Sequence, residues 1–306
     1  MSAACHSRQA KESPTPITAA PETTDAGRLQ VIDPSCAHDL KCGTGTSCCD
    51  RKSIPGGRFV RGRKLKGSNA CPAWARFQCG SVELPAHEVA VRDFEIDTFE
   101  VTVGRFREYL RSQAGADEPC RGDSEAKGQR AGLSCGPGAT WSASAKDAES
   151  LPMNCVDQAT AQAFCAWSGG RLPTEDEWEY AAAGGDEERL FPWGSASPQE
   201  HFQYVEYGSI EPKPVGRFDD GRSRWGQYDM AGNLAEWTSD HVRAVLEDSG
   251  APVPNDCEAP LAVEGNMVRG GSSSSLPACF RAVVRQLVPS TMRADWIGFR
   301  CVRAAP

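Results

Sequence analysis

Apolar side chains recur at helical spacing in only three short stretches of this sequence. The first stretch follows Thr102, which predicts a helix that begins there and buries one face. The apolar positions of that face are Val103, Phe106, Tyr109 and Leu110. A second helix is expected over residues 156–167, ending before the Gly169–Gly170 pair. Its apolar side is formed by Ala159, Ala163, Phe164 and Trp167.

The third helix has the clearest start. Thr174 and Glu177 form the Ser/Thr-x-x-Glu pattern of a capping box, in which each side chain accepts a hydrogen bond from the other residue's backbone. Trp178, Ala181 and Ala182 then face the core, and two glycines at 184–185 end the helix.

The remaining apolar segments are short and alternate as strands do. They are residues 54–62, 89–102, 267–271 and 297–304. In the last segment Ile297, Phe299 and Cys301 share one face, which we expect to point inward. Residues 113–150 are Gly-rich and polar and are interpreted as a long loop. A few helices among many short strands, without a repeating strand–helix order, favour the α+β class.

The first 29 residues show neither pattern. Residues 7–28 lack aromatic side chains and are rich in Pro, Ser and Thr, so we interpret this end as a disordered tether. The chain begins MSAACHSRQA, in which small residues precede Cys5 as they do at the end of a bacterial lipoprotein signal. Cys5 is therefore a candidate lipid anchor. The alternative is an ordinary free cysteine in a disordered end.

Fourteen cysteines are the strongest compositional signal. No CxxC pair or Cys/His cluster has zinc spacing, and the five histidines lie far apart. Disulfides formed in an oxidising compartment explain the cysteines better. We therefore expect an extracytoplasmic protein, whether periplasmic, an outer-membrane lipoprotein or secreted.

Four of the cysteines lie within residues 30–53, at positions 36, 42, 48 and 49. This cysteine-rich extension is expected to precede a main domain over residues 54–306. Adjacent Cys48 and Cys49 cannot easily bridge each other, so each should have a different partner. Pairing of Cys135 with Cys155 is predicted around the Gly-rich loop, and the competing pairing is Cys120 with Cys135. Cys257 is expected to join the extension's cysteines or Cys279.

The net charge of −8 comes without a basic cluster interleaved with aromatic residues, so nucleic acid is not an expected partner. No segment is long and apolar enough to span a membrane.

Several motifs resemble those of the formylglycine-generating enzyme / sulfatase-modifying factor family. They are EVTVGRFREYL (100–110), FCAWSGGRLPTEDEWEYAAAGG (164–185), FPWG (191–194), YDMAGNLAEWTSD (228–240), MVRGGS (267–272) and IGFRC (297–301). The resemblance implies a compact C-type lectin-like fold with little regular secondary structure. It also implies a Cys165–Cys301 disulfide. Charged residues of these motifs, Arg171, Glu177 and Glu179, are expected to form a buried network.

Active members of this family resemble copper-dependent oxidases that use two cysteines, five residues apart, shortly after the RGGS motif. Soft thiolates suit Cu(I). The matching stretch here is RGGSSSSLPACFRAVVR (269–285), in which the first cysteine position falls among Ser273, Ser274 and Ser275. Cys279 is the remaining catalytic candidate, displaced by two positions, and its simpler role is that of a disulfide partner. Copper binding is therefore not expected.

The family can also hold calcium at the turn that contains GNLAEW. The resemblance implies side-chain ligands from Asp229 and Glu236 and carbonyl ligands from Gly232 and Leu234. Alternatively, the two carboxylates only cap backbone amides. A departure within this motif is Ala235, where the family usually has Trp.

Three functions compete at this point. The missing cysteine pair favours a non-catalytic binding or scaffold module with a protein or glycan ligand. The alternative is a copper- and oxygen-dependent formylglycine-generating oxidase that acts on a sulfatase cysteine. The third is an iron-dependent enzyme similar to the family's sulfoxide synthases, which the scattered histidines argue against.

Overall fold

The computed structural model describes ten stretches of the chain. They are residues 33–36, 39–43, 45–67, 70–75, 83, 85–114, 133–142, 148–198, 208–243 and 264–305. The expected tether, Cys5, Cys120 and Cys257 lie outside the described residues. In the described part no helix combines the length and the hydropathy that crossing a bilayer requires.

Three α-helices form where the apolar spacing predicts them: α1 (Val103–Ala114), α3 (Gln158–Trp167) and α4 (Glu175–Ala183). Thr102 Oγ1 accepts the amide of Arg105 at the start of α1. The capping box of α4 is present, and Gly184 ends that helix in the left-handed region with φ 72°. The described residues also form short 3-10 turns: η1 (Pro34–Cys36), η2 (Ala73–Ala75), η5 (Gly185–Glu187), η6 (Asp219–Gly221) and η7 (Pro277–Phe280).

The predicted apolar side of α3 was partly wrong. Asp157 caps the helix by accepting the amide of Thr160 at 2.9 Å, so the helix begins two residues later than expected. Ala159 and Ala163 are exposed, and the buried face is formed by Ala161, Phe164 and Cys165 instead.

Eleven strands form four small sheets among the described residues. Their bounds are β1 (Lys41–Cys42), β2 (Thr46–Ser47), β3 (Arg51–Ile54), β4 (Gly57–Arg61), β5 (His87–Val91), β6 (Phe94–Asp97), β7 (Ala235–Arg243), β8 (Glu264–Arg269), β9 (Arg285–Val288), β10 (Ile297–Gly298) and β11 (Val302–Ala304). The sheet orders are β1-β2, β4-β5, β11-β6-β3 and β10-β7-β8-β9. This arrangement confirms the α+β class.

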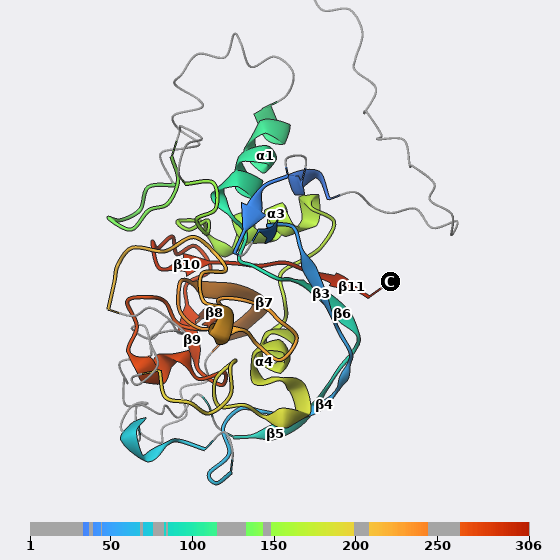
Figure 1. Ribbon diagram of the computed structural model, residues 1–306, viewed down its shortest axis with the longest axis vertical. Coiled ribbons are helices and arrows are strands. Elements are labelled where there is room, and N and C mark those ends of the chain that lie inside the picture. The colour runs from blue at the N-terminus through green and yellow to red at the C-terminus, as the bar shows by residue number, and fades with distance from the viewer. Residues whose placement is uncertain are drawn as a thin grey trace, which may run out of the picture.

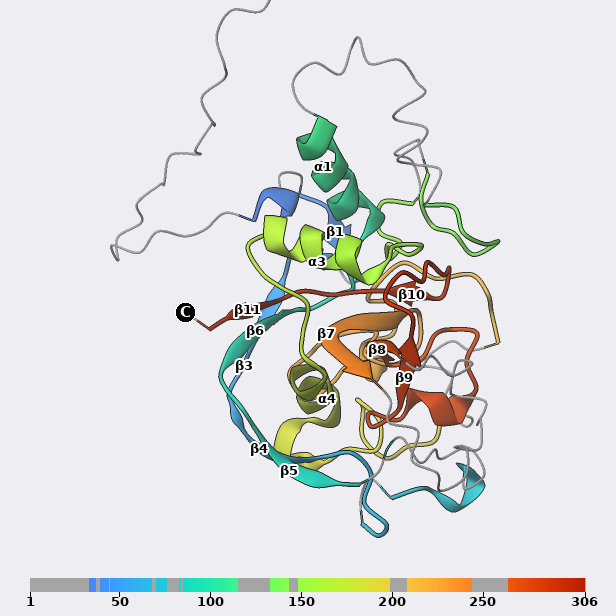
Figure 2. The same cartoon turned by 180° about the vertical axis from the view of Figure 1, so that it is seen from behind.

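The segment 89–102, expected as one strand, belongs to a bent two-stranded ribbon. β4 pairs with β5 and β3 pairs with β6 in one continuous register, and both chains bend together. At the bend Asp93 accepts the amide of Gly56 at 2.6 Å. The ribbon curves along one side of the molecule around α4, while α1 and α3 lie together at one end (Figures 1 and 2).

The final segment, also expected as a single strand, connects two sheets. β10 pairs in parallel with β7, and β11 pairs with β6. Ile297, Phe299 and Cys301 are fully buried between the two pairings, as their alternation predicted. Arg300 therefore lies where the two sheets meet.

Disulfides join distant parts of the chain. Cys165 bonds to Cys301 and Cys135 to Cys155, which are the two pairings expected from the sequence. The Cys135–Cys155 bond excludes the competing pairing with Cys120. The first of these links closes a separation of 136 residues, for which the chain-entropy contribution is about 4–5 kcal/mol. Cys48 and Cys49 have different partners, Cys42 and Cys36.

The cysteine-rich extension is attached by charge as well as by pairing. Asp33 and Asp97 are buried among Arg51, Arg105 and Arg303, and we call these five residues the cation-rich cluster. Arg303 bonds to Asp97 at 2.8 Å and to Asp33 at 2.7 Å. β3 also crosses the expected boundary at residue 53, because it pairs with β6 of the main domain.

Candidate functional site

The turn at residues 229–234 precedes β7 and has an unusual backbone. Asp229, Gly232 and Asn233 have φ values of 56°, 79° and 58°. Glycine, asparagine and aspartate are the residue types that enter this left-handed region at the lowest cost. The sequence DMAGN therefore permits a tight turn that folds back on itself.

Backbone hydrogen bonds hold this turn against the RGGS segment. Gly232 donates to the carbonyl of Gly270 at 3.0 Å, and Ser273 donates to the carbonyl of Asn233 at 3.0 Å. Ser273 is one of the positions at which the first family cysteine was expected. The turn and the residues that replace the cysteine thus form one site.

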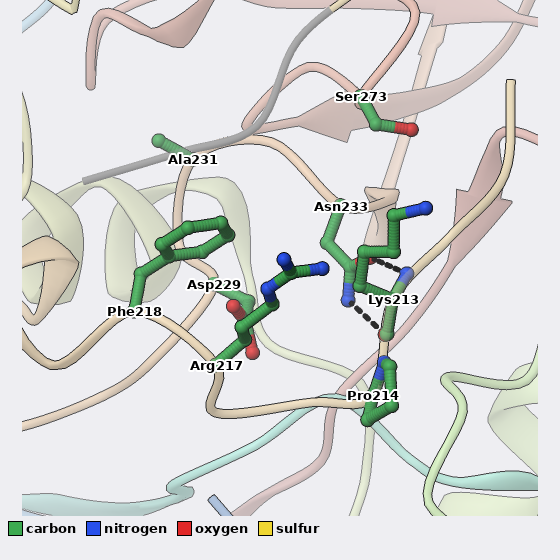
Figure 3. A pocket seen from close by; sticks show the side chains of 8 residues that line it. All are labelled: Lys213, Pro214, Arg217, Phe218, Asp229, Ala231, Asn233 and Ser273. Carbon is green, nitrogen blue, oxygen red and sulfur yellow. Dashed lines mark hydrogen bonds between the residues drawn. The ribbon is translucent and has the colours of Figure 1, made fainter. Parts of the chain in front are cut away.

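Asn233 fixes a third segment to the same place. Its Oδ1 accepts the amide of Lys213 at 2.9 Å and its Nδ2 donates to the carbonyl of Lys213 at 3.3 Å (Figure 3). Nδ2 also donates to Glu100 at 2.6 Å, and Glu100 accepts the amide of Leu234 at 3.0 Å. One buried carboxylate therefore sets the conformation of the turn.

These segments enclose a small cavity of about 10 Å³, which is room for about one water-sized species. It is lined by Lys213, Pro214, Arg217, Phe218, Asp229, Ala231, Asn233 and Ser273. Figure 3 shows these side chains: Lys213, Pro214 and Arg217 come from the segment before η6, and Ser273 comes from the RGGS segment. Two cations and one carboxylate give this cavity a polar lining.

Behind the cavity lies a group of buried carboxylates that share one cation. Glu236 pairs with Arg300 at 2.6 Å and accepts the indole N–H of Trp178 at 2.8 Å. Glu100 and Asp229 interact electrostatically with both members of that pair, and neither forms an ion pair of its own in the described part of the chain. We call Glu100, Asp229, Glu236 and Arg300 the carboxylate-rich cluster.

The excess negative charge appears in the protonation equilibria. Burial, together with the charges of Asp229 and Glu236, raises the pKa of Glu100 well above its ordinary value. Burial raises the pKa of Asp229 to about 6, with Glu236 adding to the rise and the bond from Gly216 and the charge of Arg300 opposing it. The cavity is therefore lined by a carboxyl group that changes its charge near pH 6.

Comparison with known proteins decides the family. The family model described as "Sulfatase-modifying factor enzyme 1-like domain" matches residues 41–305 of this chain. The chain belongs to the sulfatase-modifying factor family. It has the compact fold expected of this family, and the solved structure of PvdO from Pseudomonas aeruginosa superposes with a TM-score of 0.57 and 25% identity, over 87% of this chain and 100% of PvdO.

Relatives within the sulfatase-modifying factor family carry different names. Hercynine oxygenase from Mycolicibacterium smegmatis is 31% identical over 81% of this chain, and the match spans 59% of the oxygenase. "Inactive C-alpha-formylglycine-generating enzyme 2" from Mus musculus is 28% identical over 82% of this chain and 85% of its own length. Formylglycine-generating enzymes are also similar. Family membership therefore leaves the activity open.

The segment in which the resemblance places the first family thiol carries hydroxyl groups. The hydroxyl of Ser272 lies 2.9 Å from that of Ser274 and 3.4 Å from that of Ser275. Cys279 is buried in η7 and is disulfide-bonded. It does not line the cavity, which Ser273 reaches instead.

The residues proposed for calcium are close together but engaged. Glu236 already binds Arg300 and Trp178 through both oxygens. Asp229 accepts the amide of Gly216 at 2.7 Å. The excess negative charge of this region suits a bound cation. To bind one, however, Glu236 would have to use oxygens that already accept hydrogen bonds from Arg300 and Trp178. Among the residues that the structure describes, no three His, Cys, Asp or Glu side chains form a metal-binding group.

The expected charged network of the GRLPTEDEWEY motif was partly wrong. Arg171 does pair with Glu177, at 2.6 Å, but Arg171 is only half-buried. Glu179 lies elsewhere: it is buried, pairs with Arg269 and accepts the amide of Gly62 at 2.6 Å. Side chains at 177 and 179 diverge because residues two apart do not share a helix face.

Sequence reasoning missed Glu100, Lys213, Arg217 and the role of Arg300. Glu100 and Arg300 do stand within family motifs, EVT and GFRC, and a charged residue amid buried apolar positions was the available signal. Lys213 and Arg217 carry no such signal, because they lie in a segment without periodicity. Hydrogen bonds from Lys213 to Asn233 and from Gly216 to Asp229 place this segment at the cavity.

Proposed function

We propose that this chain is a non-catalytic, extracytoplasmic binding module of the sulfatase-modifying factor family. The observation that carries the proposal is the state of the cysteines. All ten cysteines in the described residues are disulfide-bonded. Between the RGGS motif and the C-terminus the chain has only Cys279 and Cys301, and Cys301 is bonded to Cys165.

Copper-dependent oxidation would require two thiolates that share one ion beside the substrate thiol. The position of the first thiol is taken by serines, whose neutral hydroxyl groups are poor ligands for Cu(I). Cys279 is buried rather than open to a substrate, and reactive thiols need accessible surroundings. These features support a binding role over the alternative role as a formylglycine-generating oxidase.

Iron-dependent chemistry receives no support from the described histidines. His87 lies on β5, where its Nδ1 is 3.2 Å from the carbonyl of Pro85. His241 lies on β7, in a different sheet, and bonds to Glu264 at 3.1 Å. A facial iron site needs two histidines and a carboxylate that occupy neighbouring coordination positions of one iron ion.

An extracytoplasmic location agrees with the disulfides, because such bonds persist in oxidising compartments. Whether the protein is periplasmic, lipid-anchored through Cys5 or secreted stays a prediction. Fractionation of cells that express the full-length gene, with metabolic labelling by a lipid precursor, distinguishes these locations. Labelling that is lost in Cys5→Ser supports the anchor.

Calcium binding at the 229–236 turn is a second part of the proposal. The three carboxylates of the carboxylate-rich cluster against one arginine support it, and oxygen ligands from a tight turn suit this ion. Asp229 and the carbonyls of Gly232 and Leu234 would hold the ion. Bound calcium would neutralise buried negative charge and stiffen the turn.

The decisive experiment incubates purified, oxidised protein with Cu(I), oxygen and a CxPxR-type peptide, and measures aldehyde by mass spectrometry. A formylglycine-generating enzyme treated in parallel serves as the positive control. We expect no aldehyde from this chain. Aldehyde that disappears in the Cys279→Ser variant would return the protein to the oxidases.

A further inference from the structure

A second and much larger cavity lies between the cysteine-rich extension and the loop at residues 219–228. It is an open groove of about 690 Å³, within the range of small-ligand sites. Its walls include Asp50, Lys52, Asp219, Asp220, Arg222 and Arg224. The groove shares no lining residue with the cavity at Ser273, and none of the four residues proposed for calcium lines it.

Two aromatic rings in the groove are each covered by an arginine. Tyr228 stacks on Phe99 with ring centroids 5.1 Å apart, and the guanidinium of Arg222 lies 5.5 Å from the Tyr228 ring. Trp225 stacks on Tyr180 at 5.4 Å, and Arg224 lies 5.3 Å from the Trp225 ring. Such cation–π contacts hold long side chains in place, so the groove presents oriented N–H donors rather than apolar ring faces.

The charges of the groove balance one another. Its lining carries three carboxylates (Asp50, Asp219, Asp220) and three cations (Lys52, Arg222, Arg224). Arg224 also pairs with Asp186 at 2.7 Å, outside the groove. Lys52 pairs with Asp50 at 2.8 Å, and Arg222 lies 4.0 Å from Asp219. An anionic ligand would meet as much repulsion as attraction here, because opposite charges are interspersed rather than segregated.

Several polar groups of the groove have unused hydrogen-bonding capacity. Asp220 is exposed and makes no hydrogen bond or ion pair within the described part of the chain. Ser223 donates to the buried Gln227, which leaves the acceptor lone pairs of its hydroxyl free. Gln227 itself is fully buried behind the groove and does not line it. Asp220 and Ser223 therefore offer acceptors, and the cationic side chains of the lining offer donors.

We propose that this groove binds a neutral oligosaccharide. Each sugar hydroxyl donates one hydrogen bond and accepts two, which matches a lining that carries both donors and acceptors and equal numbers of positive and negative side chains. A peptide is disfavoured, because peptide grooves offer an apolar channel or a free sheet edge. None of the exposed large apolar side chains of the described residues (Leu65, Trp74, Ile210, Leu276) lines the groove. The proposal rests on the binding-module function and names its ligand class.

The test is calorimetric titration of the intact, oxidised protein with hexasaccharides. The neutral probes are maltohexaose, cellohexaose, mannohexaose and chitohexaose, and the acidic probes are hexagalacturonate and a heparin hexasaccharide. We expect at least one neutral probe to bind with Kd below about 1 mM. Asp220→Ala and Arg224→Ala should each weaken that binding about tenfold, since each removes hydrogen bonds made by a charged group.

Matched controls are Asp39→Ala and Arg111→Ala, which change the same residue types in a separate cavity of about 370 Å³. They should leave the affinity unchanged. The proposal is overturned if no neutral probe binds, if the acidic probes bind more tightly and only at low salt, or if the two control variants weaken binding as much as the groove variants. The copper assay is independent of these results, so failure of the glycan assignment leaves the non-catalytic proposal standing.

Discussion

The cation-rich and carboxylate-rich clusters are both buried, but their charges are unequal in opposite directions. The cation-rich cluster sets three arginines against two aspartates, whereas the carboxylate-rich cluster sets one arginine against three carboxylates. In the first, burial alone would raise the pKa of Asp97, but Arg105 and Arg303 outweigh it and hold that pKa below its ordinary value. In the second, the pKa values of Glu100 and Asp229 are raised.

This difference in charge corresponds to a difference in role: the cation-rich cluster attaches the extension, and the carboxylate-rich cluster suits a ligand site. The surplus arginines favour the ionised form of Asp97 and, through their ion pairs with Asp33, hold the extension against the domain. Surplus carboxylates leave negative charge uncompensated beside a cavity, an arrangement that favours a proton or a bound cation. Arg300 and Cys301 connect the two clusters, because Arg300 pairs with Glu236 while the amide of Cys301 donates to Asp97 at 3.3 Å.

The largest effect is expected from removal of the shared cation. Arg300→Met leaves the three buried carboxylates of this cluster without their shared cation, so the free energy of unfolding should fall by about 3–5 kcal/mol. Urea denaturation at pH 7 measures it. Arg58→Met, which removes an exposed arginine, should change stability by less than about 0.5 kcal/mol. Equal effects of the two changes would remove the distinction between the clusters.

Asp97→Asn tests the cation-rich cluster and should lower the free energy of unfolding by about 3 kcal/mol, because the three arginines then share the single carboxylate of Asp33. The folded-state pKa of Asp97 lies below 3.8, so its contribution is present above about pH 3.8 and is lost as the pH falls through the folded value. Acid unfolding followed by circular dichroism should show this component in the parent protein and not in the variant.

Asp229→Asn should raise the free energy of unfolding at pH 7, whereas Asp97→Asn should lower it. The folded pKa of Asp229 is about 6 against 3.8 in the unfolded chain, so its contribution is full below about pH 3.8 and is lost as the pH rises through about 6. At pH 7 the variant should gain about 2–3 kcal/mol and should show a flatter profile between pH 4 and 6. A loss of stability instead would mean that the turn needs the anion, as a bound cation requires.

Calcium binding should give the smallest of these changes in stability. At a free concentration about tenfold above Kd the gain is about 1.4 kcal/mol, measured as the difference in Tm between millimolar calcium and EDTA. Asp229→Ala should abolish the difference, and Asp39→Ala should not. An unchanged Tm in the parent protein would remove calcium from the carboxylate-rich cluster.

Much of the fold was predictable where local chemistry is strong. The capping box at Thr174 and the apolar spacing after Thr102 act within one helix, so both helices were predicted. β7 was not predicted, because its residues are buried through pairing with β8 and β10 rather than through alternation. The bend at Asp93 was not predicted for a similar reason, since it depends on Gly56 in the paired chain.

The sequence by itself determined the family, the α+β class, the Cys165–Cys301 bond and the lack of a second thiol after the RGGS motif. These depend on residue identity and order. The tertiary structure decided which charges meet: Glu236 with Arg300, Glu179 with Arg269, and Asp229 with no ion pair among the residues that the structure describes. Pairing between residues 60 or more positions apart is set by how sheets and loops pack, and burial then amplifies each pairing because water no longer screens it.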